Sequence, residues 1–119
     1  MKKLEKWSKN SSQINEKDKN MTPFERFKNL NTEGNLWIYV LTLGREREIC
    51  DEEVRKLVFE KFGFLPNNLL IKSVLYRLRR EGYIKTERYQ GKRAYRTTEK
   101  GVRELEKMKT FCQELLEKI

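Results

Sequence analysis

The sequence contains no histidine, and this absence excludes several common catalytic arrangements. Without an imidazole the chain has no Ser/His/Asp or Cys/His nucleophile system and no HExxH metal site. No carboxylate pair, Gly-rich phosphate loop or set of metal ligands is placed to do chemistry either. We therefore expect a protein that is not an enzyme, with no catalytic residues, no metal and no cofactor.

Cysteines and long apolar runs are also scarce. Cys50 and Cys112 lie far apart without a CxxC partner, which excludes a zinc site and a dense disulfide framework and favours two buried thiols. The longest apolar run, residues 36–43, is broken by Thr42 and is much shorter than the about 20 residues of a membrane span. The basic start has no apolar block behind it, so we do not expect it to be a secretory signal. We expect a soluble, cytoplasmic protein with no membrane partner.

Positive charge is what the sequence has in excess. Its 119 residues include 27 Lys and Arg against 18 Asp and Glu, a formal net charge of +9, and 37% hydrophobic residues suffice for one compact core. Residues 67–96 alone hold nine Lys and Arg against two Glu. A thermophilic surface rich in ion pairs would explain abundant charge but not this clustering. The clustering indicates a surface that binds a polyanion, with nucleic acid as the first candidate.

The N-terminal part of the sequence predicts a tail and a short helix. Residues 1–20, rich in Lys, Asn and Ser, are expected to form a flexible basic tail. Thr22 and Glu25 form a capping box around Pro23, which fits the first helical turn. These signals predict a helix that begins here and ends near Leu30.

Two further helices are expected before the basic segment. Asn35 is expected to cap a helix that Gly44 ends, although periodicity alone also allows a buried strand there. Residues 45–49 are expected to contain a short strand. Asp51 is then expected to cap a third helix that Gly63 ends.

The basic segment predicts an amphipathic helix and a hairpin. A helix over residues 68–81 has one apolar face, formed by Ile71, Val74, Leu75 and Leu78, and one strongly cationic face. Two β-rich runs, residues 83–89 and 94–98, predict a hairpin whose tip near Gly91 is basic and whose Ile84 and Tyr95 face the core. Arg suits guanine edges, while Lys and Ser suit phosphates, so the cationic face fits a DNA major groove. A solvated helix face is the alternative interpretation.

The order of helix, short strand, helix, turn, helix and two-stranded wing resembles the winged helix-turn-helix superfamily. Residues 73–84, SVLYRLRREGYI, look like its recognition helix running into the wing, and residues 91–101, GKRAYRTTEKG, look like the wing return of PadR-type regulators. Lys72 and Thr97 depart from the PadR pattern, which usually has tyrosine and leucine there.

This resemblance implies an α+β, mostly α, winged-helix domain over residues 21–98 that binds double-stranded DNA as a homodimer. The recognition helix is expected to enter the major groove and the wing to touch the backbone. The candidate DNA-binding residues are Asn67, Asn68, Lys72, Ser73, Tyr76, Arg77, Arg79, Arg80, Arg88, Lys92, Arg93 and Arg96.

Residues 99–119 predict a long C-terminal dimerisation helix with apolar residues at heptad spacing. Such a seam needs a partner, which is either a second copy of the chain or the chain's own domain; a dimer would present two recognition helices to one duplex. Cys112 in the seam is either a packed thiol or part of a disulfide between copies. The candidate dimer residues are Leu105, Met108, Phe111, Cys112, Leu115, Leu116 and Ile119.

Three functions fit these observations. A sequence-specific transcriptional regulator is favoured. A low-specificity, nucleoid-associated chromatin protein of the archaeal kind is supported by the few Asn and Gln on the cationic face. A winged-helix module whose hairpin docks acidic proteins is the third. The sequence leaves open whether a small-molecule effector binds; Trp37 is a candidate lining residue, although a core position explains it more simply.

Overall fold

The computed structural model describes residues 20–119, so the predicted tail at residues 1–20 lies outside the described residues except for its last position. The first helix, α3 (Pro23–Leu30), begins and ends as predicted. The Glu25 backbone N–H donates to Thr22 Oγ1 at 3.1 Å, and the Thr22 N–H donates to Glu25 Oε2 at 3.0 Å, which confirms the capping box. None of the residues of α3 is buried.

The second helix, α4 (Leu36–Glu46), follows a 3₁₀ turn, η1 (Glu33–Asn35), and resolves the choice between helix and strand. Two details of the prediction were wrong. The Asn35 side chain makes no capping hydrogen bond, and Gly44 lies inside the helix instead of ending it. A Cβ at Gly44 would stand 2.5 Å from a ring carbon of Tyr95, so glycine serves close packing between α4 and the sheet.

The next segment contains β1 (Ile49–Cys50), the 3₁₀ turn η2 (Asp51–Glu53) and α5 (Val54–Phe62). The strand was predicted within residues 45–49, but it is shorter and begins only at Ile49, because α4 continues to Glu46. Asp51 does not cap α5; instead the Glu53 carboxylate accepts the Cys50 N–H at 3.0 Å. Gly63 ends α5 in the left-handed conformation, φ 84°, as expected.

The basic segment forms α6 (Asn68–Arg80), β2 (Ile84–Tyr89) and β3 (Lys92–Thr97). The three strands form an antiparallel sheet in the order β1-β3-β2, in which Ile49 pairs with Tyr95. Gln90 and Gly91 connect β2 to β3 with φ of 53° and 77°, the positive values of a two-residue hairpin turn. The predicted hairpin is confirmed.

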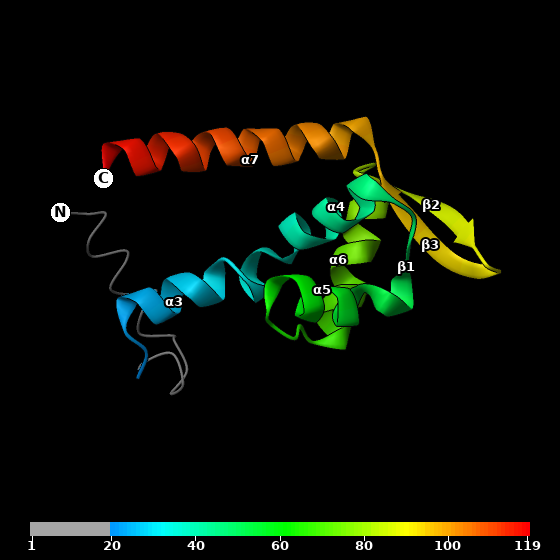
Figure 1. Cartoon of the computed structure of the whole chain (residues 1–119), viewed down its shortest axis with the longest axis horizontal. Coiled ribbons are helices and arrows are strands. Elements are labelled where there is room, and N and C mark those ends of the chain that lie inside the picture. Colours follow the sequence, from blue (N-terminus) through cyan, green and yellow to red (C-terminus); the bar gives the residue numbers. More distant parts are fainter. Residues whose placement is uncertain (1–19) are drawn as a thin grey trace.

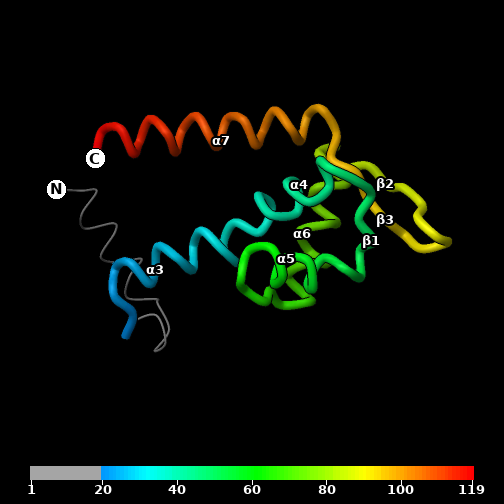
Figure 2. The backbone as a smooth tube through the Cα atoms, in the orientation of Figure 1, coloured from blue at the N-terminus to red at the C-terminus, as the bar shows by residue number. Residues whose placement is uncertain are grey.

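The last helix, α7 (Glu99–Lys118), is capped by Thr98 and starts beside the sheet. The core lies between α4, α5, α6, the sheet and the first turns of α7, where Leu105 is 1% exposed. The hairpin projects from one end of this core, while α3 and the rest of α7 extend toward the other end (Figures 1 and 2). Within residues 20–119, none of the helices combines the length and hydropathy that a bilayer crossing requires.

Candidate nucleic-acid interface

The helix α6 has a buried apolar face and an exposed cationic face, as the sequence predicted. Ile71, Val74, Leu75 and Leu78 are buried. The Asn67 side chain caps the helix by accepting the N–H groups of Leu69 and Leu70, at 2.8 and 3.3 Å, so its oxygen serves the fold. The exposed predicted residues on α6 are Asn68, Lys72, Ser73, Tyr76, Arg77 and Arg80.

A hollow lies between α6, the η2 turn with α5, and the hairpin. Five predicted residues line it, so the structure brings them to one place: Asn68, Lys72, Tyr76 and Arg79 of α6 and Arg93 of β3. Arg77 and Arg80 are exposed as well, but neither is among the residues that line this hollow. The hollow is where a helix face and a wing meet, a geometry suited to a nucleic-acid backbone and groove.

The cations at the wing tip are exposed but already have intramolecular acceptors. The Lys92 ammonium bonds to the Glu52 carboxylate, and this hydrogen bond raises the pKa of Lys92. Arg93 Nε lies 3.9 Å from Asp51 Oδ2, and Arg88 Nη1 lies 3.4 Å from the Gly91 carbonyl oxygen. Because these contacts are solvent-exposed, they are weak and exchangeable for contacts with a polyanion.

Arg96 lies at the other end of β3, away from the tip residues. Its Nη1 is 3.1 Å from Glu48 Oε1, and its side chain is half-buried. The Glu48 backbone N–H and the Arg96 guanidinium both lower the pKa of the Glu48 carboxyl. The ion pair between Arg96 and Glu48 therefore joins the sheet to the segment after α4, and Arg96 has a structural role within the described residues.

Arg79 differs most from the prediction, because it is not on the exposed face. Its side chain is 12% exposed, and its two Nη atoms donate to both Asp51 carboxylate oxygens at 2.7 and 2.8 Å. Nε donates to Thr86 Oγ1 at 3.0 Å, and Nη2 also donates to the Ala94 carbonyl at 3.2 Å. Arg79 thus fixes the position of the wing relative to α6 and η2, and its guanidinium is engaged in these contacts at the wall of the hollow.

The predicted dimer residues on α7 divide into two groups. Leu105 is buried in the domain core, and Met108 is partly buried against that core, so both contribute to the chain's own fold. Cys112 is exposed, which corrects the expectation of two buried thiols; Cys50 is buried as expected. The exposed apolar residues farther along α7 are Phe111, Leu115, Leu116 and Ile119.

Sequence reasoning missed two features of these surfaces. Arg55 of α5 lines the hollow and donates from Nε to the Pro66 carbonyl at 3.0 Å, although nothing in its local pattern marks it. Phe24, Phe27 and Leu30 of α3 are all more than half exposed. Their spacing on one short helix was a usable signal for an unpartnered apolar face.

The structure is similar to several solved regulators. Bacillus subtilis PadR, solved in complex with operator DNA, is 26% identical with a TM-score of 0.55, and the match covers 61% of this chain and 45% of that chain. A transcriptional regulator from Clostridium thermocellum is 26% identical with a TM-score of 0.58, over 71% of this chain and 85% of that one. A PadR-like transcription factor from Bacteroides fragilis is 17% identical with a TM-score of 0.64, over 78% and 94%.

The chain matches less than half the length of the Bacillus subtilis PadR chain. No protein-family model matches the sequence, and no curated protein does. The element order and these neighbours define the chain as a winged helix-turn-helix protein. PadR-family regulators are among its structural neighbours, which confirms the resemblance expected from residues 73–84 and 91–101.

Proposed function

We propose that this protein is a DNA-binding transcription regulator that uses α6 in the major groove and the hairpin on the sugar-phosphate backbone. The observation that carries the proposal is the hollow where Lys72 and Tyr76 of α6 meet Arg93 of the wing. The neighbours add support, since one of them is a PadR solved in complex with operator DNA. The residues proposed to contact DNA are Asn68, Lys72, Ser73, Tyr76, Arg77, Arg80, Arg88, Lys92 and Arg93.

We propose further that the protein binds DNA as a homodimer through its two exposed apolar faces. Phe111 is 66% exposed and Ile119 is 91% exposed on α7, while α3 adds an exposed face at the same end of the molecule. Groups of exposed large apolar side chains such as these usually mark an interaction site. A two-fold pair joined there leaves both hairpins and both α6 helices free for one duplex.

Anisotropy of a labelled random duplex at several salt concentrations tests DNA binding. We expect log affinity to fall with log salt at about 0.9 per neutralised phosphate. Lys72→Glu and Arg93→Glu should each weaken binding by about tenfold or more, because each replaces an attractive charge at the hollow by a repulsive one. Lys118→Glu changes the net charge by the same amount at the end of α7 and should leave the affinity nearly unchanged.

Three outcomes would change the proposal. If Lys118→Glu weakens binding as much as Lys72→Glu and leaves the sedimentation of the protein unchanged, net charge and not the hollow determines affinity. If the chain covers random duplexes evenly and prefers no selected sequence, it is a chromatin-type protein, which the few Asn and Gln on the α6 face would fit. If it binds no duplex even at low salt, the basic wing serves an acidic protein partner.

A further inference from the structure

Leu69 of α6 is an exposed leucine that the proposed DNA contacts do not include. Its side chain is 76% exposed, and among residues 20–118 no other large apolar side chain is as exposed. Single exposed apolar residues are common on protein surfaces and need no explanation by themselves. Leu69 differs from them because it lies on the face of α6 that is otherwise polar and cationic.

The geometry of α6 places Leu69 in the middle of this exposed face. The Asn67 side chain accepts the Leu69 N–H at 2.8 Å and so fixes the start of the helix, of which Leu69 is the second residue. At about 100° per residue, Leu69 lies within roughly 20° of Tyr76 and Arg80 around the helix axis. The buried side chain of Leu78 lies on the opposite side. Leu69, Tyr76 and Arg80 therefore form a central row that faces away from the core.

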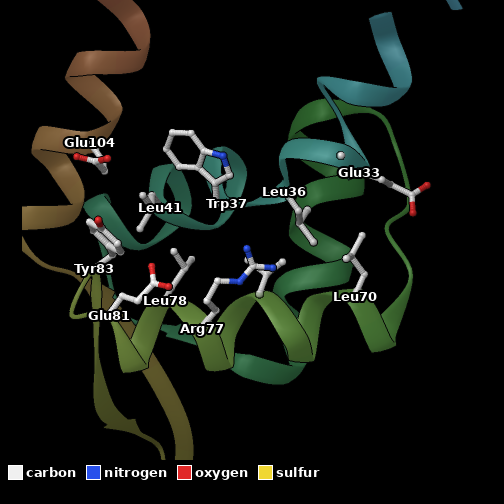
Figure 3. Close-up of a pocket in the computed structure, with 12 residues that line it drawn as sticks. Glu33, Leu36, Trp37, Leu41, Leu70, Arg77, Leu78, Glu81, Tyr83 and Glu104 are labelled. Atoms are coloured by element: carbon white, nitrogen blue, oxygen red, sulfur yellow. The ribbon is translucent and has the colours of Figure 1, made fainter. Parts of the chain in front are cut away.

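Cations flank this central row on both sides. Lys72 lies on the flank toward the wing, where it lines the hollow together with Arg93. Arg77 lies on the other flank, where it lines a cavity between α6 and α4 together with Trp37 (Figure 3). A DNA major groove has a matching layout, since phosphates border the base edges on both sides. Lys72 and Arg77 therefore suit the two phosphate borders, and the row between them suits the bases.

A leucine in a major groove has one favourable kind of partner among the base edges. The C5 methyl of thymine is the one methyl group that the base pairs present there, beside hydrogen-bond donors and acceptors. Leucine packed on a donor or acceptor would remove its water without replacing the hydrogen bond, whereas packing on the methyl buries apolar surface. Leu69 is also at the correct end of α6, because the N-terminal residues of a recognition helix contact base edges.

We propose that Leu69 recognises thymine in the major groove by packing against its C5 methyl group. This inference rests on the proposed function, because it requires α6 to enter the groove. Lys72 and Arg93 contact phosphates that every duplex has, so they hold the protein on any sequence. Leu69 adds a preference for duplexes that present a thymine opposite the start of α6, once in each half-site of the proposed homodimer.

Removal of thymine methyl groups from a preferred duplex tests the proposal. The full chain first selects its preferred duplex from a random pool, and this duplex is then made with thymine or with 2′-deoxyuridine at every thymine position. The two duplexes differ only in C5 methyl groups. Anisotropy should show that the uracil duplex binds at least about fourfold more weakly, the effect of burying one methyl group. Replacing one thymine at a time should locate the loss at one position in each half-site.

Leu69→Ala separates a direct contact from an effect of the methyl groups on duplex shape. This variant should bind the thymine and uracil duplexes with equal affinity, whereas an effect of shape would persist in it. Leu65→Ala makes the same change at a second exposed leucine, between α5 and α6, and should keep the wild-type ratio of affinities. Because Leu69 is exposed, Leu69→Ala should leave the urea midpoint of unfolding nearly unchanged.

Three results would overturn the role of Leu69 while DNA binding itself stands. The first is equal affinity of the wild-type chain for the thymine and uracil duplexes. The second is a wild-type ratio that persists in Leu69→Ala, which would assign the methyl preference to another residue or to duplex shape. The third is a random pool from which no thymine-containing site is enriched. If no duplex binds at any salt concentration, the proposed function itself fails.

Discussion

Arg79 and Arg80 are adjacent in sequence, yet the structure gives them opposite roles. The Arg79 guanidinium holds Asp51, Thr86 and the Ala94 carbonyl together, whereas Arg80 is exposed. Arg79→Lys keeps the charge but loses the paired contact with both carboxylate oxygens. We expect the free energy of unfolding to fall by about 1–2 kcal/mol, measured by urea denaturation at a fixed protein concentration.

Arg80→Lys is the matched control for this measurement. Because Arg80 is exposed, its replacement should change the free energy of unfolding by less than about 0.5 kcal/mol. An equal loss of stability in the two variants would show that the contacts of Arg79 are not what holds the wing in place.

Residue roles of this kind were only partly predictable. Helical periodicity correctly assigned Lys72 and Tyr76 to the exposed side of α6, because that assignment depends on neighbours in the same helix. It placed Arg79 on the same side, although the main partner of Arg79, Asp51, is 28 residues away in sequence. Only the packing of α6 against η2 and the wing brings the two together.

At the scale of elements, β3 is attached to α4 through Tyr95. This side chain is fully buried, its hydroxyl donates to the Val40 carbonyl at 2.8 Å, and its ring packs against Gly44. Tyr95→Phe keeps the ring and removes only the hydrogen bond, so we expect the free energy of unfolding to fall by about 1 kcal/mol at pH 8. Urea denaturation measures this loss, and an unchanged stability would mean that the ring alone attaches the strand.

The same residue predicts how stability depends on alkaline pH. Burial raises the pKa of the Tyr95 hydroxyl above its value of about 10 in an unfolded chain, so the folded state favours the neutral form. Its contribution is fully present below pH of about 10 and is lost as pH rises above that value. Denaturation between pH 9 and about 11 should show a less steep loss of stability in Tyr95→Phe than in the wild type. Burial raises the pKa of Tyr39 too, so some of the loss should remain.

Elements were predictable where their signals are local. The capping box of α3, the stop at Gly63 and the turn at Gly91 depend on a few adjacent residues and were found from sequence. Gly44 resembled a helix stop, but it lies inside α4 because Tyr95 of a distant strand needs the space of its missing side chain. Helix boundaries in this chain therefore depend on tertiary packing wherever the sheet touches α4.

At the scale of the whole molecule, the basic and apolar surfaces are at opposite ends. The hairpin lies at one end, and the exposed faces of α3 and distal α7 lie at the other (Figure 1). This separation lets two copies join without covering the proposed DNA interface. It also explains why the heptad pattern on α7 combined core residues with exposed residues. Leu105 and Met108 pack in or against the domain core, and the same apolar stripe continues along α7 to the exposed residues.

A truncation of α7 between its core residues, Leu105 and Met108, and its exposed apolar residues, which begin at Phe111, tests the homodimer without unfolding the domain. A chain that ends at Lys109 keeps Leu105 and Met108, so it should fold, whereas a chain that ends at Thr98 loses Leu105 and should not. Removing residues 110–119 deletes the exposed apolar half of α7, so sedimentation should find a dimer for the full chain and a monomer for the shorter one. The monomer should bind a duplex more weakly, because each molecule then presents one α6 instead of two.

A full chain that sediments as a monomer, or a shorter chain that stays dimeric, would contradict the proposed interface. In the second case α3 alone would be the next surface to vary.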